Sequence, residues 1–128
     1  MSNSNNKKRV LVVDDDNNLN TVLVDKLNFS GFEAQGAPDG VEGLKQSLDF
    51  HPDLILLDLL MPKMGGLAML KELRKDEWGK GAKVVILTLL EKTDYVAQAM
   101  EDGVAGYLVK TAYSLDEVVK KIQEMIDK

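Results

Sequence analysis

The stretch PDLILLDLLMP, residues 52–62, decides the fold of this chain. Its central run, residues 54–57, is apolar at every position, which is typical of a β-strand that helices cover on both faces. The run ends at Asp58. Because a charged side chain is rarely placed against a core without a function, an aspartate directly after such a strand indicates a site at the end of the strand.

Similar apolar runs recur along the chain and predict four more strands, at residues 10–13, 32–37, 84–87 and 107–109. Segments with helical spacing lie between and after them, at about residues 19–27, 39–50, 67–75, 92–102 and 115–126. Gly31 predicts the end of the first helix, and Ser114 with Glu117 predicts a capping box at the start of the last. Strict alternation of strands and helices predicts a parallel sheet with right-handed crossovers, and therefore a doubly wound α/β fold with three layers, α/β/α.

Size and composition limit the class of protein. The 128 residues fit one domain, which we place at residues 8–128 after a polar N-terminal tail at 1–7. The chain has no cysteine and no apolar run of membrane-spanning length, and residues 1–10 lack the apolar core of a signal peptide, so we expect a cytoplasmic protein. The net charge of −5 argues against direct binding of nucleic acid. We expect His51 in a turn and Trp78 partly buried beneath a loop.

Polar residues follow four of the predicted strands: Asp14, Asp15 and Asp16, then Asp58, Thr88 and Lys110. In a doubly wound sheet these strand ends share one edge, where ligands bind. Clustered carboxylates repel each other and require a cation, and oxygen donors without histidine or cysteine favour Mg²⁺. A lysine and a threonine can hold phosphoryl oxygens beside the metal, and an aspartate there can act as a nucleophile that forms an acyl phosphate.

Four motifs on these strands carry a family resemblance: VVDD at 12–15, PDLILLDLLMP at 52–62, ILT at 86–88 and GYLVK at 106–110. In this order they resemble the receiver domains of two-component response regulators, in particular stand-alone chemotaxis-type receivers, over about residues 8–127. The resemblance implies a flavodoxin-like five-stranded sheet in the order 2-1-3-4-5. It also implies phosphotransfer from a sensor histidine kinase or a phosphotransfer protein, and a switch in a protein-interaction surface.

Carried over by position, the resemblance makes Asp58 the phosphoacceptor. Asp15, Asp58 and the backbone carbonyl of Leu60 would bind Mg²⁺ directly, and Asp14 would hold it through a water molecule. Asp16 falls one place past the acidic pair of the family, so we predict that it caps the first helix. The family catalyses only its own phosphorylation and dephosphorylation, and is not an enzyme with an external product.

The switch residues follow from the same resemblance. Lys110 would pair with the aspartate carboxylate and then with the phosphoryl group, Thr88 would move toward the phosphoryl oxygens, and Tyr107 would turn inward. Leu60 and Leu90 occupy positions that flank the path of the hydrolysing water, so we predict a long-lived phosphorylated form. The resemblance also implies a downstream protein target, which the sequence does not identify. It further allows a homodimer that forms on phosphorylation.

Three departures from the family pattern stand out. Thr111 replaces the usual proline after the lysine of the last strand, and we expect a trans peptide bond there because a non-proline cis bond costs about 2.5 to 4 kcal/mol. Leu89 is bulky where the family has a small residue. Gly65 and Gly66 replace the commoner Asp-Gly, which removes a local helix cap.

Two other functions agree with parts of the sequence. The departures at Thr111 and Leu89 would suit a receiver-like interaction module that works without phosphate. A haloacid-dehalogenase-type phosphatase also uses an Asp-x-Asp motif after its first strand, as in residues 14–16. However, Asn18 stands where that motif needs Thr or Val, no acidic pair follows Lys110, and Asp58 would have no role.

Overall fold

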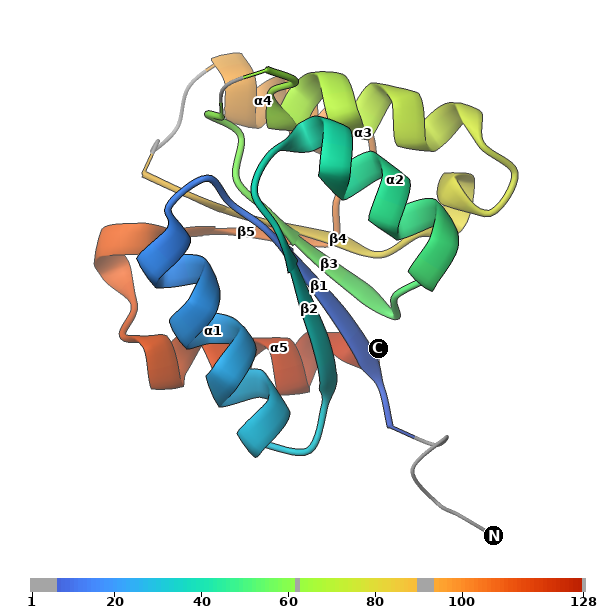
Figure 1. Ribbon diagram of the computed structural model, residues 1–128. Coiled ribbons are helices and arrows are strands. Elements are labelled where there is room, and N and C mark those ends of the chain that lie inside the picture. The colour runs from blue at the N-terminus through green and yellow to red at the C-terminus, as the bar shows by residue number, and fades with distance from the viewer. Residues whose placement is uncertain (1–6, 62, 90–93, 128) are drawn as a thin grey trace, which may run out of the picture.

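The structure is a computed structural model that describes residues 7–61, 63–89 and 94–127. Five strands alternate with five α-helices along this part of the chain (Figure 1): β1 (Arg9–Val13), α1 (Asn17–Phe29), β2 (Glu33–Ala37), α2 (Gly40–Phe50), β3 (Leu54–Leu57), α3 (Gly66–Lys75), β4 (Val84–Thr88), α4 (Asp94–Glu101), β5 (Gly106–Val109) and α5 (Leu115–Ile126). Every predicted strand is found within one residue of its predicted bounds. Residues 1–6 of the predicted tail and 92–93 of the predicted fourth helix lie outside the described residues.

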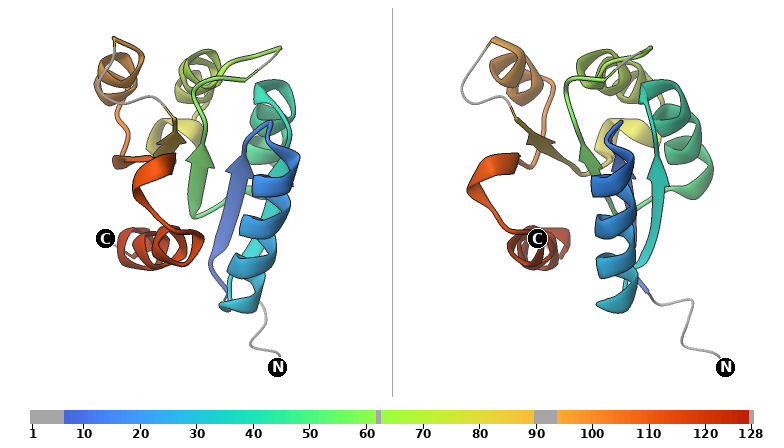
Figure 2. Two further views of the ribbon diagram at one scale, coloured as in Figure 1. Left: turned by 90° about the vertical axis from the view of Figure 1, so that its left-hand side faces the viewer. Right: turned by 60° about the vertical axis from the view of Figure 1, so that its left-hand side comes forward.

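The strands form one parallel sheet in the order β2-β1-β3-β4-β5, as predicted. Val12 of β1 pairs with Gly36 of β2 on one side and with Leu56 of β3 on the other. Figure 2 shows that helices cover both faces of this twisted sheet, which gives the predicted three layers. Within the described residues, no helix is both long enough and apolar enough to span a bilayer.

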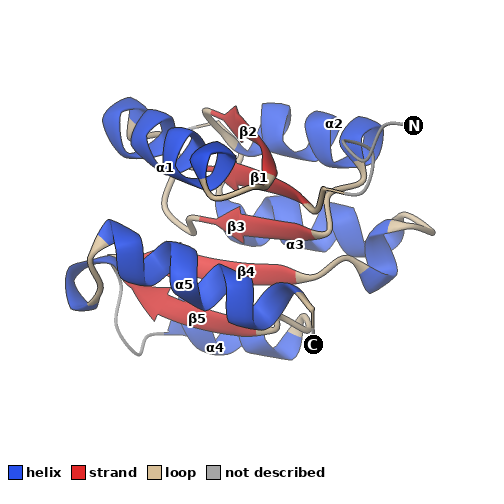
Figure 3. Cartoon of the chain, turned by 90° about the horizontal axis from the view of Figure 1, so that it is seen from below, coloured by secondary structure: helices blue, strands red, loops and turns tan. Residues whose placement is uncertain are grey.

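Each face of the sheet has its own core. α1 and α5 cover one face, and α2, α3 and α4 cover the other (Figure 3). Val10 and Val12 pack toward α1 and α5, whereas Leu11 and Val13 pack toward the other three helices. Because successive side chains of a strand point to opposite faces and both faces are buried, β1 is apolar at each of these positions.

The helix ends follow the predicted signals. Gly31 has a φ of 99° directly after the end of α1, a conformation that favours glycine. Ser114 and Glu117 form both hydrogen bonds of the capping box at the start of α5. Gly65 precedes α3 without a side-chain cap, as expected. The peptide bond before Thr111 is trans, since no cis bond occurs among the described residues.

Two contacts organise the connections at the amino ends of the strands. The ring of His51, which ends α2, stacks on Trp78 with 4.4 Å between centroids and 9° between planes. His51 is exposed and Trp78 half-buried, so both fit their predicted places. The guanidinium of Arg74 donates hydrogen bonds to four backbone carbonyls, those of Gly79, Ala82, Asp102 and Gly103. It thereby ties the end of α3 to the connections before β4 and β5.

Candidate functional site

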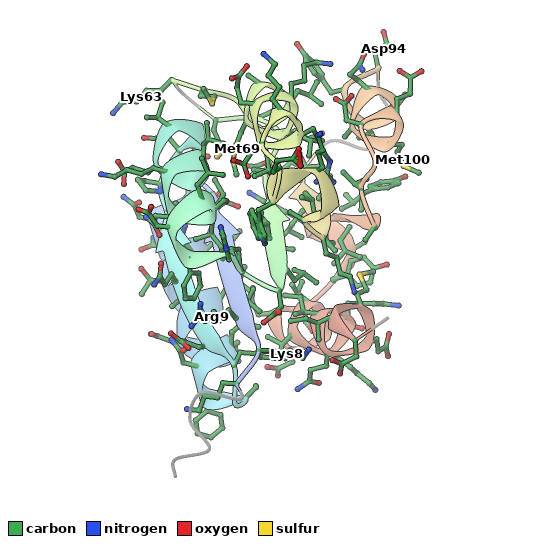
Figure 4. All side chains as sticks on the ribbon, turned by 90° about the vertical axis from the view of Figure 1, so that its right-hand side faces the viewer. Lys8, Arg9, Lys63, Met69, Asp94 and Met100 are labelled. Atoms are coloured by element: carbon green, nitrogen blue, oxygen red, sulfur yellow. The ribbon has the colours of Figure 1, made fainter. Side chains whose placement is uncertain are left out.

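The polar residues that follow the strands meet at the carboxyl edge of the sheet. They line a pocket of about 260 Å³ formed by Asp15, Asp16, Asp58, Leu60, Thr88, Leu89 and Lys110. Figure 4 shows Lys63 and Asp94 at this end of the molecule and Lys8 and Arg9 toward the opposite end. The topology of the parallel sheet therefore brings residues from four separate connections to one place.

Three carboxylates lie close enough to share one cation. One oxygen each from Asp14, Asp15 and Asp58 lies within 4.8 Å of the others. Asp14 and Asp58 are buried, whereas Asp15 is exposed at the mouth of the pocket. The donors are all oxygens, which suits a hard divalent cation such as Mg²⁺. Asp16 is outside this group, and its Oδ1 accepts a hydrogen bond from the backbone N–H of Leu19, which confirms the predicted cap of α1.

Lys110 provides the positive charge of the site. Its Nζ lies 2.8 Å from Oδ2 of Asp14 and 3.2 Å from Oδ2 of Asp58. The resemblance implied a pairing with Asp58, and the structure adds a shorter contact to Asp14. The side chain of Asp14 is only 2% exposed, and a carboxylate buried to this extent requires a charged or hydrogen-bonding partner. Its other oxygen, Oδ1, accepts a hydrogen bond from the backbone N–H of Asp16 at 2.9 Å.

The pKa values in this cluster move for different reasons. Burial raises the pKa of Asp14 above its usual value, although the hydrogen bonds from Lys110 and from the backbone of Asp16 act in the opposite direction. Burial alone would lower the pKa of Lys110, but its hydrogen bond to Asp14 and the nearby charge of Asp58 outweigh burial and raise it. Lys110 is therefore held firmly in its charged form.

The other candidate residues surround Asp58. The backbone N–H of Leu60 donates to Oδ1 of Asp58 at 3.3 Å, and the Leu60 side chain is about half exposed. Thr88 is fully buried at the last position of β4, and Leu89 after it is exposed. Tyr107 is half-buried and packs on the core beneath α3 and α4. Leu90 lies outside the described residues.

The glycine pair after β3 has a second role that the sequence interpretation missed. A Cβ at Gly66 would overlap with the carbonyl oxygen of Asp58, so only glycine lets the start of α3 pack against this backbone. The N–H of Gly66 also donates to the carbonyl of Leu59 at 3.0 Å. The position of Asp58 is thus set by α3 as well as by β3.

Asn20 was also missed. It lies in α1, is buried beneath the connection from β1, and its side-chain amide donates to the carbonyl oxygens of Val12, Asp14 and Ala37 at 3.3, 3.0 and 3.0 Å. The available signal was Gly36, because a glycine inside a strand often marks a close approach of another group. A Cβ at Gly36 would overlap with Oδ1 of Asn20.

Comparisons with known proteins agree with this geometry. The family model for the response regulator receiver domain matches residues 10–123. The chain is 30% identical to the DNA-binding dual master transcriptional regulator RpaA of Synechocystis over 118 residues. This aligned segment covers 92% of the chain and 48% of RpaA. It is 34% identical over 117 residues to the DNA-binding response regulator MtrA of Mycobacterium tuberculosis, covering 91% of this chain and 50% of MtrA. The chain thus spans about half the length of these curated relatives.

Solved structures match over nearly their full length. The chemotaxis protein CheY4 of Vibrio cholerae superposes with a TM-score of 0.85 at 27% identity, covering 93% of this chain and 98% of that one. A CheY-like receiver domain protein of Methanospirillum hungatei superposes with a TM-score of 0.86 at 27% identity, covering 94% of each chain. The similarity therefore includes the whole sheet and the edge at which the acidic cluster lies.

Proposed function

This chain belongs to the response regulator receiver domain family, and we propose that Asp58 is its phosphorylation site. Receiver domains are signalling modules, and phosphorylation of an aspartate is general in the family. The observation that supports Asp58 is its place at the end of β3, where its buried carboxylate faces Lys110 and two further carboxylates in one pocket. A haloacid-dehalogenase-type phosphatase would give Asp58 no role, so this arrangement does not support that alternative.

The phosphoryl donor would be a sensor histidine kinase or a phosphotransfer protein. An oxygen of Asp58 forms the bond to phosphorus while the phosphorus–nitrogen bond of the donor breaks, and the imidazole leaves with a proton. Lys110 contacts Asp58 Oδ2 before transfer and would then hold a phosphoryl oxygen. Thr88 offers a hydroxyl donor at the same edge, and Tyr107 is the aromatic residue that would turn inward.

Asp15, Asp58 and the backbone carbonyl of Leu60 would hold Mg²⁺ directly, and Asp14 would hold it through a water molecule. Their oxygen-only donor set and their separation support this assignment. Bound Mg²⁺ supplies positive charge that offsets the carboxylates and the incoming phosphoryl group. Since Asp15 is the exposed member, it is the carboxylate that a metal entering from solvent meets first.

The output of the module would be a change in a protein-interaction surface, recognised by a downstream protein or by a second copy of the chain. The two curated relatives described above are named as DNA-binding proteins. That activity belongs to proteins about twice as long, and we expect no direct contact with nucleic acid from this domain. Its net charge of −5 supports this expectation.

Labelling with acetyl phosphate tests the assignment. The protein should gain one phosphoryl group in the presence of Mg²⁺ and none in excess chelator, and Asp58→Asn should remove the label. Asp53→Asn is the matched control, because Asp53 precedes the same strand and its carboxylate accepts a hydrogen bond from the backbone of Arg9, far from the pocket. A hydroxylamine-sensitive phosphoryl group on Asp58→Asn would refute the site. A folded wild-type protein that takes up no label would be the phosphate-independent module.

A further inference from the structure

We propose that Asn20 is a positioning residue for the metal site, acting through the backbone that joins Asp14 to Asp15. This inference rests on the proposed metal-binding function of the acidic cluster. The hydrogen bonds that the Asn20 amide donates go to backbone carbonyls and not to the carboxylates of the cluster. One of these bonds goes to the carbonyl oxygen of Asp14, which belongs to the peptide unit between the two aspartates.

The side-chain amide of Asn20 joins the connection after β1 to the end of β2. The register between β1 and β2 ends at the pair Val13 and Ala37, so the carbonyl oxygen of Asp14 lies beyond the ladder and needs another donor. A side-chain amide has two N–H donors, and Asn20 directs its Nδ2 to the carbonyls of both Asp14 and Ala37 at 3.0 Å. The N–H of Asp14 donates to the same Ala37 oxygen at 3.1 Å. The peptide units on both sides of Asp14 are therefore fastened to the end of β2.

The consequence for a metal is geometric. Rotation of the peptide unit between Asp14 and Asp15 would change the direction in which the Asp15 side chain leaves the backbone, and with it the distance to Asp58. Mg²⁺ requires near-ideal octahedral geometry at about 2.0 to 2.1 Å, whereas Ca²⁺ accepts irregular oxygen ligands at about 2.3 to 2.6 Å. Losing the Asn20 amide should thus weaken Mg²⁺ binding more than Ca²⁺ binding.

Gly36 completes the arrangement from the neighbouring strand. Because a Cβ at this position would overlap with Oδ1 of Asn20, Gly36→Ala should displace the amide without removing it. The two substitutions then act on one contact from opposite sides. Once Asn20 is alanine, the amide that a Cβ at position 36 would overlap is gone and only a 3.3 Å contact with the Val24 side chain remains, so the second substitution should cause no further loss of Mg²⁺ affinity.

Titration calorimetry of the full chain with Mg²⁺ and with Ca²⁺ tests the inference. Asn20→Ala should raise the Mg²⁺ Kd by about 10-fold or more, the range seen when residues that orient metal ligands are removed, and should raise the Ca²⁺ Kd less. Asn28→Ala is the matched control, since Asn28 also joins α1 to β2, through Ala34 at the far end of the helix. It should leave the Mg²⁺ Kd within about twofold of wild type, a change too small to indicate a lost ligand interaction.

Further variants keep the test decisive. Gly36→Ala should match Asn20→Ala in Mg²⁺ Kd, and the double variant should show no additional loss. Asn20→Ser, which retains a short donor, should fall between wild type and Asn20→Ala and serves if Asn20→Ala does not fold. A wild-type Mg²⁺ Kd in Asn20→Ala, or equal losses for Mg²⁺ and Ca²⁺, would overturn the role of Asn20 alone. A wild-type protein that binds no Mg²⁺ would overturn the metal site itself, and the role of Asn20 with it.

Discussion

Replacing Lys110 by alanine should destabilise the protein strongly, because it leaves two buried carboxylates without their cation. At an effective dielectric constant of about 20, contacts of 2.8 and 3.2 Å each correspond to roughly 5 to 6 kcal/mol of attraction before desolvation is subtracted. Removing one partner of a buried ion pair typically costs about 3 to 5 kcal/mol. We expect a loss in this range near neutral pH without divalent cation, measured by urea denaturation.

The loss should depend on conditions in a way that packing alone cannot produce. Lowering the pH should reduce it, because burial raises the pKa of Asp14 and the native variant can take up a proton there. Mg²⁺ should also reduce it by supplying the missing charge. Lys26→Ala is the control: Lys26 also lies 2.8 Å from a carboxylate, that of Asp116, but both are exposed, so the cost should stay below about 1 kcal/mol. A loss for Lys110→Ala below about 1 kcal/mol, or one insensitive to pH and Mg²⁺, would refute the electrostatic argument.

The raised pKa of Lys110 predicts how its contribution to stability changes at alkaline pH. A lysine whose pKa in the folded state exceeds its value in the unfolded state stabilises the fold fully below the unfolded value. This contribution is present below about 10.5 and is lost as the pH rises through the higher folded value. The difference in unfolding free energy between wild type and Lys110→Ala should therefore shrink above this pH. A constant difference through the alkaline range would contradict the raised pKa.

Three further substitutions have definite expected results. Asp15→Asn should weaken Mg²⁺ binding in calorimetry, whereas Asp16→Asn should leave it nearly unchanged, since asparagine also caps helices; equal losses would refute the chosen register. Gly66→Ala should cost about 1 to 3 kcal/mol in urea denaturation because the start of α3 must move. Gly65→Ala, where a Cβ would make only ordinary van der Waals contacts, should cost at most about 1 kcal/mol, and the reverse order would contradict the packing described. Leu60→Asn should speed loss of the phosphoryl group by about tenfold, or roughly 1.4 kcal/mol of barrier, by orienting a water molecule. Decay of labelled protein at the wild-type rate would show that this leucine does not exclude water.

The fold could be predicted because burial on two faces leaves a direct trace in the sequence. The strand that precedes Asp58 is apolar at all four positions, and the alternation of such runs with helical spacing determines both the parallel sheet and the edge at which the site residues meet. The cap at Asp16 could also be predicted, because a helix cap involves residues only a few positions apart in the sequence, here Asp16 and Leu19.

The features that sequence reasoning missed all depend on contacts between distant segments. Asn20 has no local pattern that distinguishes it from a solvent-facing asparagine, and its partners come from the ends of two strands. The close contact of Lys110 with Asp14 follows from how deeply Asp14 is buried, which the sequence does not express. The glycine pair was interpreted only as the loss of a cap at Gly65, because the sequence gives no sign that Gly66 packs against the backbone of Asp58.

The stacked pair of His51 and Trp78 gives the molecule a built-in optical probe with a useful location. Trp78 is the only tryptophan of the chain, and it lies at the amino ends of the strands, across the full length of the sheet from Asp58. Its emission therefore reports global unfolding without direct disturbance by ligands at the pocket. Any change in that emission on phosphorylation would have to be transmitted through the sheet or its helices, so the same signal measures how far the switch propagates.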